Sequence, residues 1–133
     1  LRSFPTRRSS DLYVQAVGGG DPVALVTGPE NDDYPAWSPD GTWIVYSHSK
    51  TYGSLKSIRR IRADGSGEAE VLIEDPQGAS FASISPDGKY VVYQSNRGDE
   101  REIFVATYPE GTRRTKISTG GGEFPKWRGN RIY

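Results

Sequence analysis

The stretch YPAWSPDGTWIVYS at residues 34–47 decides the fold, because FASISPDGKYVVYQS at residues 81–95 repeats its pattern. A third and partial copy reads FPKWRGNRIY at residues 124–133. The equivalent aromatic positions are separated by 47 and then by 43 residues. A period of this length is the sequence mark of structural units that stack or are arranged radially.

Each of the first two copies contains a Ser-Pro-Asp-Gly tetrapeptide, which predicts a tight turn between two strands. Proline presets φ at the second turn position, aspartate tolerates the third, and glycine takes the left-handed conformation that closes a hairpin. The third copy departs from this pattern with Arg128 and Gly129, so its turn is left open. The predicted turn residues are Ser38, Pro39, Asp40 and Gly41 in one copy and Ser85, Pro86, Asp87 and Gly88 in the next.

The segments after these turns, TWIVYSHS and KYVVYQSN, are apolar at successive positions, which predicts strands covered on both faces. Two more strand-like runs follow in each unit, separated by a turn at Asp64-Gly65 or Glu110-Gly111. The fold class predicted is all-β with four strands per unit, and no helix of three turns is expected. The expected strands are residues 34–38, 42–48, 56–63 and 69–74, then 81–85, 89–95, 102–107 and 113–118.

Six residues recur once per unit and are candidates for a repeated core. Three aromatic residues occupy equivalent places, and a large apolar residue follows each of them three positions later. Because the pattern recurs with the unit, we expect core packing, and an aromatic ligand cage is the alternative. The residues are Tyr34 and Trp37, Phe81 and Ile84, and Phe124 and Trp127.

The phrases PAWSPDGTWIVYS and SISPDGKYVVYQS, with LYVQAVGGGDPVALV and EIFVATYPEG as third and fourth strands, resemble the WD40-like repeats of TolB-type β-propellers. The segment REIFVATYPEGTRRTKISTGGGEFPKW is most similar to propellers appended to bacterial serine/threonine protein kinases. The resemblance implies a partial β-propeller of about two to three four-stranded blades, taken from a ring of typically four to eight. Its expected parts are a half blade at 13–27, blades at 34–74 and 81–119, and the start of a blade at 124–133.

Residues 1–12 differ from this pattern. The segment SFPTRRSSDL at residues 3–12 matches the translation of a short-read sequencing adapter, TCTTTCCCTACACGACGCTCTTCCGATCT. Arg7 and Arg8 also suggest a twin-arginine signal, and the serines after them a phosphorylation site, but no apolar run follows the arginines. We therefore interpret residues 1–12 as an artefact that lies outside the sheets, and residues 13–133 as the propeller.

Composition argues against several classes of partner. The chain has no cysteine for a disulfide or a thiolate ligand, and no apolar run near the roughly 20 residues that a membrane span needs. Without residues 1–12, 14 basic and 16 acidic residues remain, which argues against nucleic acid binding. We interpret two basic clusters as protection of exposed outer strands against edge pairing: Lys56, Arg59, Arg60 and Arg62, and Arg113, Arg114 and Lys116.

The sequence offers no motif that points to catalysis. His48 is the single histidine and is expected to be a rim or packing residue. The glycine runs at 18–20 and 120–122 lead into strands, which favours turns over a phosphate loop. PENDDYP at 29–35 lacks the alternation of a calcium-binding EF-hand loop and is interpreted as a solvated loop. We expect no catalytic, cofactor-binding or metal site, and no kinase, peptidase or nuclease activity in this chain.

The resemblance implies a protein-interaction or sensing module whose ligand is a protein or peptide and whose neighbours are the remaining blades of the same polypeptide. It would be the C-terminal propeller of a bacterial serine/threonine protein kinase. The alternatives are the gating propeller of a prolyl oligopeptidase-like peptidase and a free-standing TolB-like protein. The resemblance also favours a periplasmic or extracytoplasmic location. Kinase motifs upstream or a G-x-S-x-G motif downstream would discriminate between the first two.

Overall fold

The structure is a computed structural model that describes residues 2–5, 10–96 and 100–133. Within these ranges the chain is all-β, and no helix there is long and apolar enough to cross a membrane.

The N-terminal strands are β1 (Arg2–Pro5), β2 (Ser10–Val14) and β3 (Val23–Val26). The first blade comprises β4 (Asn31–Trp37), β5 (Trp43–Ser49), β6 (Ser57–Arg62) and β7 (Glu70–Ile73). The second comprises β8 (Ala79–Ile84), β9 (Tyr90–Ser95), β10 (Glu102–Thr107) and β11 (Thr115–Lys116), and β12 (Trp127–Arg128) and β13 (Arg131–Ile132) form a last hairpin.

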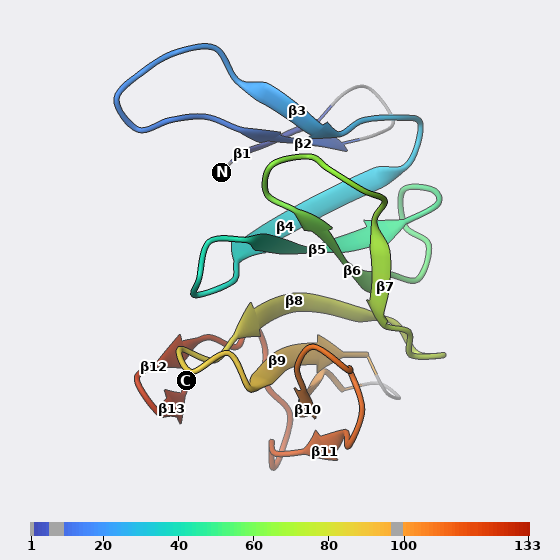
Figure 1. Ribbon diagram of the computed structural model, residues 1–133. Helices are drawn as coiled ribbons and strands as arrows, with labels where there is room; N and C mark the ends of the chain where they lie inside the picture. The colour runs from blue at the N-terminus through green and yellow to red at the C-terminus, as the bar shows by residue number, and fades with distance from the viewer. Residues whose placement is uncertain (1, 6–9, 97–99) are drawn as a thin grey trace.

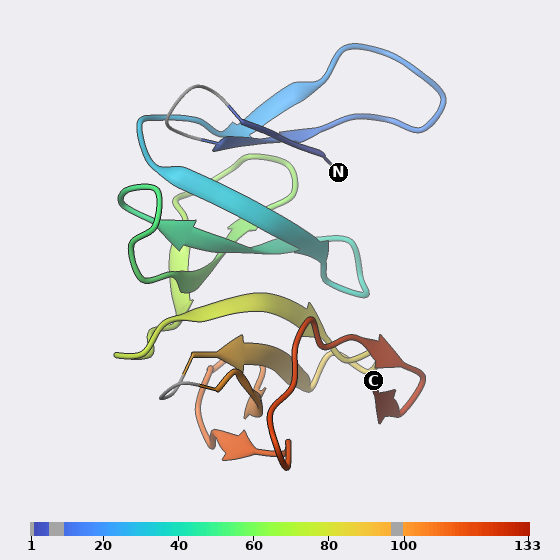
Figure 2. The ribbon, with the colours of Figure 1, turned by 180° about the vertical axis from the view of Figure 1, so that it is seen from behind.

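Each blade is a four-stranded antiparallel meander in which neighbours in sequence are neighbours in the sheet, and in the first blade β4 also pairs in parallel with β2, which joins β1–β3 to that sheet. Figures 1 and 2 show the blades as successive layers, with the β2–β3 hairpin beyond the first and the β12–β13 hairpin beside the second. The prediction of an all-β fold with four strands per unit is confirmed. The expected strand at 113–118 is shortened to the two residues of β11, and before its start Arg113 takes a left-handed φ of 51°.

The two blades share one hydrophobic core. Val45 and Ile58 of the first blade pack with Val91, Tyr93 and further buried residues of the second. On the other face of β5, residues 44 and 46 pack with Leu12 and the β2–β3 hairpin. The strand WIVY is therefore covered on both faces, as its continuous apolar pattern predicted, and each such side chain contributes about 1.5–3 kcal/mol on burial.

The expectation that residues 1–12 lie outside the sheets is wrong for residues 2–5 and 10–12, and the rest of that segment, Arg7 and Arg8 included, lies outside the described residues. Strand β1 pairs antiparallel with β2, with Arg2 opposite Tyr13, and Leu12 is fully buried in the core. Leu12 has this position because Leu12-Tyr13-Val14 is the third-strand pattern that recurs as Ile103-Phe104-Val105. The origin of residues 1–12 as an adapter stays a prediction.

Candidate interaction surface

The three recurrent aromatic residues lie in one row across the blades. The ring centroids of Tyr34 and Phe81 are 4.1 Å apart, and those of Phe81 and Phe124 are 4.6 Å apart. Tyr34 belongs to β4 and Phe81 to β8, the first strands of the two blades, which contact each other. We call Tyr34, Phe81 and Phe124 the aromatic row.

All three residues of the aromatic row have the same unusual backbone conformation. Their φ angles are 53°, 56° and 51°, a left-handed region in which a bulky side chain costs about 1–3 kcal/mol. In β4 and β8 the ladder shifts register at this residue, between Asp33 and Ala36 and between Ser80 and Ser83. Such bulges re-aim a side chain away from the regular pleat. The strain recurs at each copy and is therefore part of the repeat.

Each blade holds the strained residue of the next blade through a hydrogen bond. The Phe81 N–H donates to Oγ of Ser47 at 3.2 Å, and the Phe124 N–H donates to Oε1 of Gln94 at 3.1 Å. Ser47 and Gln94 occupy equivalent positions in β5 and β9, the second strands of their blades. The two side chains act as inter-blade latches that offset part of the backbone strain.

The expectation that the recurrent residues form the core is wrong for most of them. Tyr34 is 46% exposed, Trp37 43% and Phe124 53%. Phe81 and Trp127 are half-buried, and the Trp127 indole N–H donates to the carbonyl of Ser83 at 3.0 Å. Ile84 is buried. The rings leave the core because the left-handed residue turns the chain at the bulge, which the periodicity of the sequence does not reveal.

A hollow of about 560 Å³ opens beside the aromatic row. The row forms one side of it, and Pro35, Ala82, Pro125 and Lys126 contribute to the rest. At its Tyr34 end the ammonium group of Lys56 lies 4.6 Å from the ring centroid. This surface is therefore mainly apolar, with Lys126 in its lining and the Lys56–Asp33 ion pair beside Tyr34.

The two Ser-Pro-Asp-Gly segments form turns with matching hydrogen bonds. The Gly41 N–H donates to the Ser38 carbonyl at 3.0 Å, and the Gly88 N–H donates to that of Ser85 at 2.8 Å. In each turn the aspartate Oδ1 accepts from the serine hydroxyl, at 2.5 Å for Asp40 and 2.6 Å for Asp87. These hydroxyl donors, with backbone N–H donors behind them, hold both aspartate pKa values below the usual range. Pro39 and Pro86 line a hollow of about 470 Å³ between the turns.

The basic residues of β6 do not protect an outer strand, because β6 lies between β5 and β7. Arg60 pairs with Glu70 at 2.8 Å and stacks 4.0 Å from the ring centroid of Trp43, and Arg62 lies 4.7 Å from that ring. The outer-strand interpretation therefore fails for Lys56, Arg59, Arg60 and Arg62.

The second basic cluster has a mixed outcome. Lys116 lies in β11, at the edge of its sheet, and pairs with Glu102 at 3.2 Å. Arg114 instead joins the blades, because its guanidinium donates to the Glu74 carbonyl at 2.8 Å. Arg113 is exposed beside it.

His48 is a buried packing residue with a buried carboxylate partner. Its Nδ1 lies 2.8 Å from Oδ1 of Asp32, and its Nε2 lies 3.4 Å from the partly exposed Glu30. Burial raises the pKa of Asp32, and the hydrogen bond to His48 opposes that shift. The interpretation of PENDDYP as a solvated loop is wrong for Asn31 and Asp32, which are buried in β4. Asp32 and His48 are the same number of residues from Asp40 in the predicted turn. Residues at equal distances from a hairpin turn face each other across it, and this was the sequence signal that would have paired them.

The described residues contain no group of three or more histidine, cysteine, aspartate or glutamate side chains that could hold a metal. The described surface offers apolar rings and cation–carboxylate pairs.

Comparisons with known proteins agree with this architecture. No family model matches the chain, and no curated protein matches it. Among solved structures it is similar to a putative TolB from Agrobacterium tumefaciens, with 27% identity and a TM-score of 0.72 over 80% of this chain and 40% of that chain. It is also similar to TolB from Acinetobacter baumannii, with 20% identity and a TM-score of 0.73 over 89% of this chain and 29% of that one. The chain thus has the fold of part of a TolB β-propeller and spans less than half the length of either protein.

Proposed function

We propose that this chain is a non-catalytic part of a β-propeller that serves as a protein-interaction or sensing module. The observation that carries the proposal is the aromatic row, in which Tyr34 and Phe124 stay 46% and 53% exposed. Exposed aromatic rings are the side chains that most often anchor protein interfaces. In a closed propeller, the first strands of the blades surround the central channel, where a ligand meets several blades at once.

The ligand proposed is a protein or peptide with apolar side chains. The aromatic row is held by ring contacts and by the latches of Ser47 and Gln94, so little conformational freedom is left to lose on binding. The ammonium group of Lys126, which lines the hollow, favours a ligand with an acidic residue beside the apolar ones. No cofactor is part of this proposal, and neither nucleic acid nor a membrane is the proposed partner.

The wider context proposed is the C-terminal propeller of a bacterial serine/threonine protein kinase, outside the cytoplasm. The support is the resemblance of REIFVATYPEGTRRTKISTGGGEFPKW to such propellers. The propeller of a prolyl oligopeptidase-like peptidase and a free-standing TolB-like protein are the alternatives. The complete gene tests this context. H-R-D and D-F-G motifs upstream support the kinase, and G-x-S-x-G downstream replaces it with the peptidase.

Selection of displayed random peptides against the 133-residue chain tests the binding surface. We expect enriched peptides with apolar and acidic residues, and a loss of binding in Phe124→Ala, which exchanges an exposed ring. Val17→Ala is the matched control, because Val17 is a fully exposed apolar residue outside the hollow. Enriched peptides that bind Phe124→Ala as well as the parent chain would show that the aromatic row is not the binding surface.

A further inference from the structure

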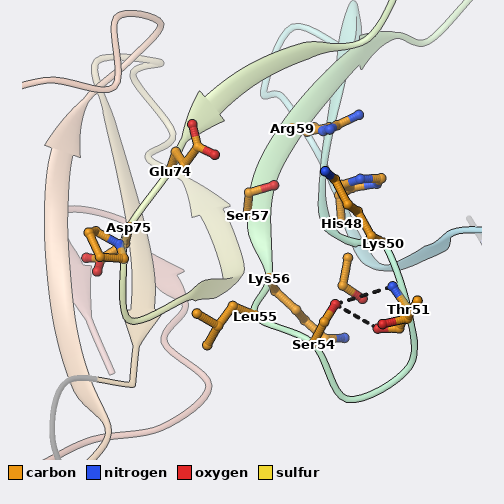
Figure 3. Close-up of a pocket in the computed structure, with 12 residues that line it drawn as sticks. His48, Lys50, Thr51, Ser54, Leu55, Lys56, Ser57, Arg59, Glu74 and Asp75 are labelled. Carbon is orange, nitrogen blue, oxygen red and sulfur yellow. Dashed lines mark hydrogen bonds between the residues drawn. The ribbon is translucent and has the colours of Figure 1, made fainter.

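A second hollow, of about 900 Å³, lies at the end of the first blade that is opposite its Ser-Pro-Asp-Gly turn. It is formed by the end of β5, the loop to β6, the start of β6 and the segment after β7. Figure 3 shows His48, Lys50 and Arg59 on one wall, with Glu74 and Asp75 coming from the other side. The aromatic row does not line this hollow.

Buried polar atoms without a hydrogen-bond partner gather at this corner of the blade. They are Nε of Arg59, Oγ of Ser49, Nε2 of His48 and Nδ2 of Asn31. Ser49 is 2% exposed and His48 4%, and Ser49, His48 and Arg59 all line the hollow. Asn31 is the register partner of Ser49. A buried polar group left unpaired costs about 1–3 kcal/mol, so a cluster of them indicates a missing partner.

The charges on this wall favour an anion as that partner. Lys56 is neutralised by Asp33, with Nζ 2.5 Å from Oδ2, and His48 lies between the carboxylates of Asp32 and Glu30. Among the described residues, Lys50 and Arg59 have no ion pair of their own. Glu74 and Asp75 oppose an anion from the far side, which confines it to the wall of Lys50 and Arg59.

We propose that this wall binds an anionic oxygen group, a carboxylate or a phosphate, between the Arg59 guanidinium, the Ser49 hydroxyl and the Lys50 ammonium. Arg59 Nε–H and Ser49 Oγ–H are donors that lack an acceptor, and a carboxylate or phosphate oxygen accepts two or more such bonds. We assign this group to an acidic side chain of the protein partner. Only that assignment rests on the proposed function.

Titration of the 133-residue chain with inorganic phosphate and, separately, with acetate tests the site. Amide chemical shifts are followed by NMR at constant ionic strength, with chloride as the reference salt. We expect saturable shifts confined to residues 48–59 with at least one of the two anions. The anion that saturates at the lower concentration identifies phosphate or carboxylate as the preferred group.

Variants separate the site from a general effect of salt. Arg59→Gln should weaken binding roughly tenfold to a hundredfold, because it removes a charge-assisted hydrogen bond. Lys50→Gln should also weaken it, and because Lys50 is exposed this variant keeps the fold. Lys89→Gln removes an exposed positive charge at the opposite end of the second blade and should change nothing. Shifts that do not saturate, or that Lys50→Gln leaves unchanged, would overturn the site and leave the aromatic row untouched.

Discussion

Gly111 and Gly88 form a matched pair that measures how closely the two blades pack. Both have a left-handed φ, 69° for Gly111 and 73° for Gly88, so an alanine at either position carries the same backbone penalty of about 1–2 kcal/mol. Their surroundings differ. A Cβ at Gly88 would have no atom within 4 Å, whereas a Cβ at Gly111 would collide with the carbonyl oxygen of Leu72. Leu72 belongs to β7 of the preceding blade.

The collision at Gly111 involves backbone on both sides. Its N–H donates to the Thr107 carbonyl at 2.8 Å, which fixes the turn between β10 and β11. Leu72 O lies at the end of the first blade, and a flexible side chain is not available to move away. Relief requires the blades to separate at this point, and overpacking of this kind costs about 1–3 kcal/mol or more. We therefore expect Gly111→Ala to lower the free energy of unfolding by at least about 1–3 kcal/mol more than Gly88→Ala does.

Urea unfolding followed by tryptophan fluorescence measures the difference. With m values of about 1–3 kcal/mol/M, a further 1 kcal/mol lowers the midpoint by roughly 0.3–1 M. Equal midpoints for the two alanine variants would refute the reasoning, because they would show that the β10–β11 turn does not rest on the first blade. An equal and large loss in both would assign the cost to the left-handed backbone alone.

Two further changes test the turns and the latches. In the folded chain the pKa of Asp87 is lowered, so its carboxylate stabilises the fold above the unfolded-state pKa, and this stability is lost as pH falls through the folded-state pKa. Asp87→Asn removes this contribution. In a pH series of urea unfolding, the variant should therefore lose less stability on acidification than the parent chain does. Gln94→Ala should lower the unfolding free energy by about 1–3 kcal/mol and speed amide exchange at Phe124, whose N–H loses its acceptor, whereas unchanged exchange there would contradict the latch.

Local chemistry explains which features the sequence reveals. The strands and the two Ser-Pro-Asp-Gly hairpins follow from turn residues and from apolar runs that act within a few residues, and these features were predicted. The exposure of Phe124 was not predicted, because its left-handed backbone is held by a contact with the preceding blade, the acceptance of the Phe124 N–H by Gln94 Oε1. Long-range contacts of this kind leave no local pattern in the chain.

Arg60 and Asp32 show the same limit for charged residues. A basic residue on a strand suggests an edge strand. Arg60 instead lies on an inner strand, where its guanidinium stacks on the Trp43 ring and forms an ion pair with Glu70. Asp32 is buried because His48 lies opposite it across the hairpin. In both cases the partner comes from another strand, and the composition of a single segment cannot supply it.

The N-terminal strand allows the adapter interpretation to be tested by stability. A free strand edge accepts any extended backbone, so the pairing of β1 with β2 does not depend on which residues form β1. Each hydrogen bond of that ladder contributes about 0.5–1.5 kcal/mol, and ordering each residue costs about 1–2 kcal/mol. The two terms nearly cancel, so we expect deletion of residues 1–5 to change the unfolding free energy by about 1 kcal/mol or less.

Leu12→Ala should behave in the opposite way. Leu12 is fully buried with Ile44, Tyr46 and Ile61, so its truncation should cost about 2–5 kcal/mol. Urea unfolding of the two variants beside the parent chain gives both values. If deletion of residues 1–5 costs as much as Leu12→Ala, the residues of β1 stabilise the sheet through their own side chains. Residues 2–5 would then belong to the natural blade. A small cost for the deletion together with a large one for Leu12→Ala would agree with residues 2–5 as a foreign segment, and would show that Leu12 fills a core position of the repeated third-strand pattern whatever its origin.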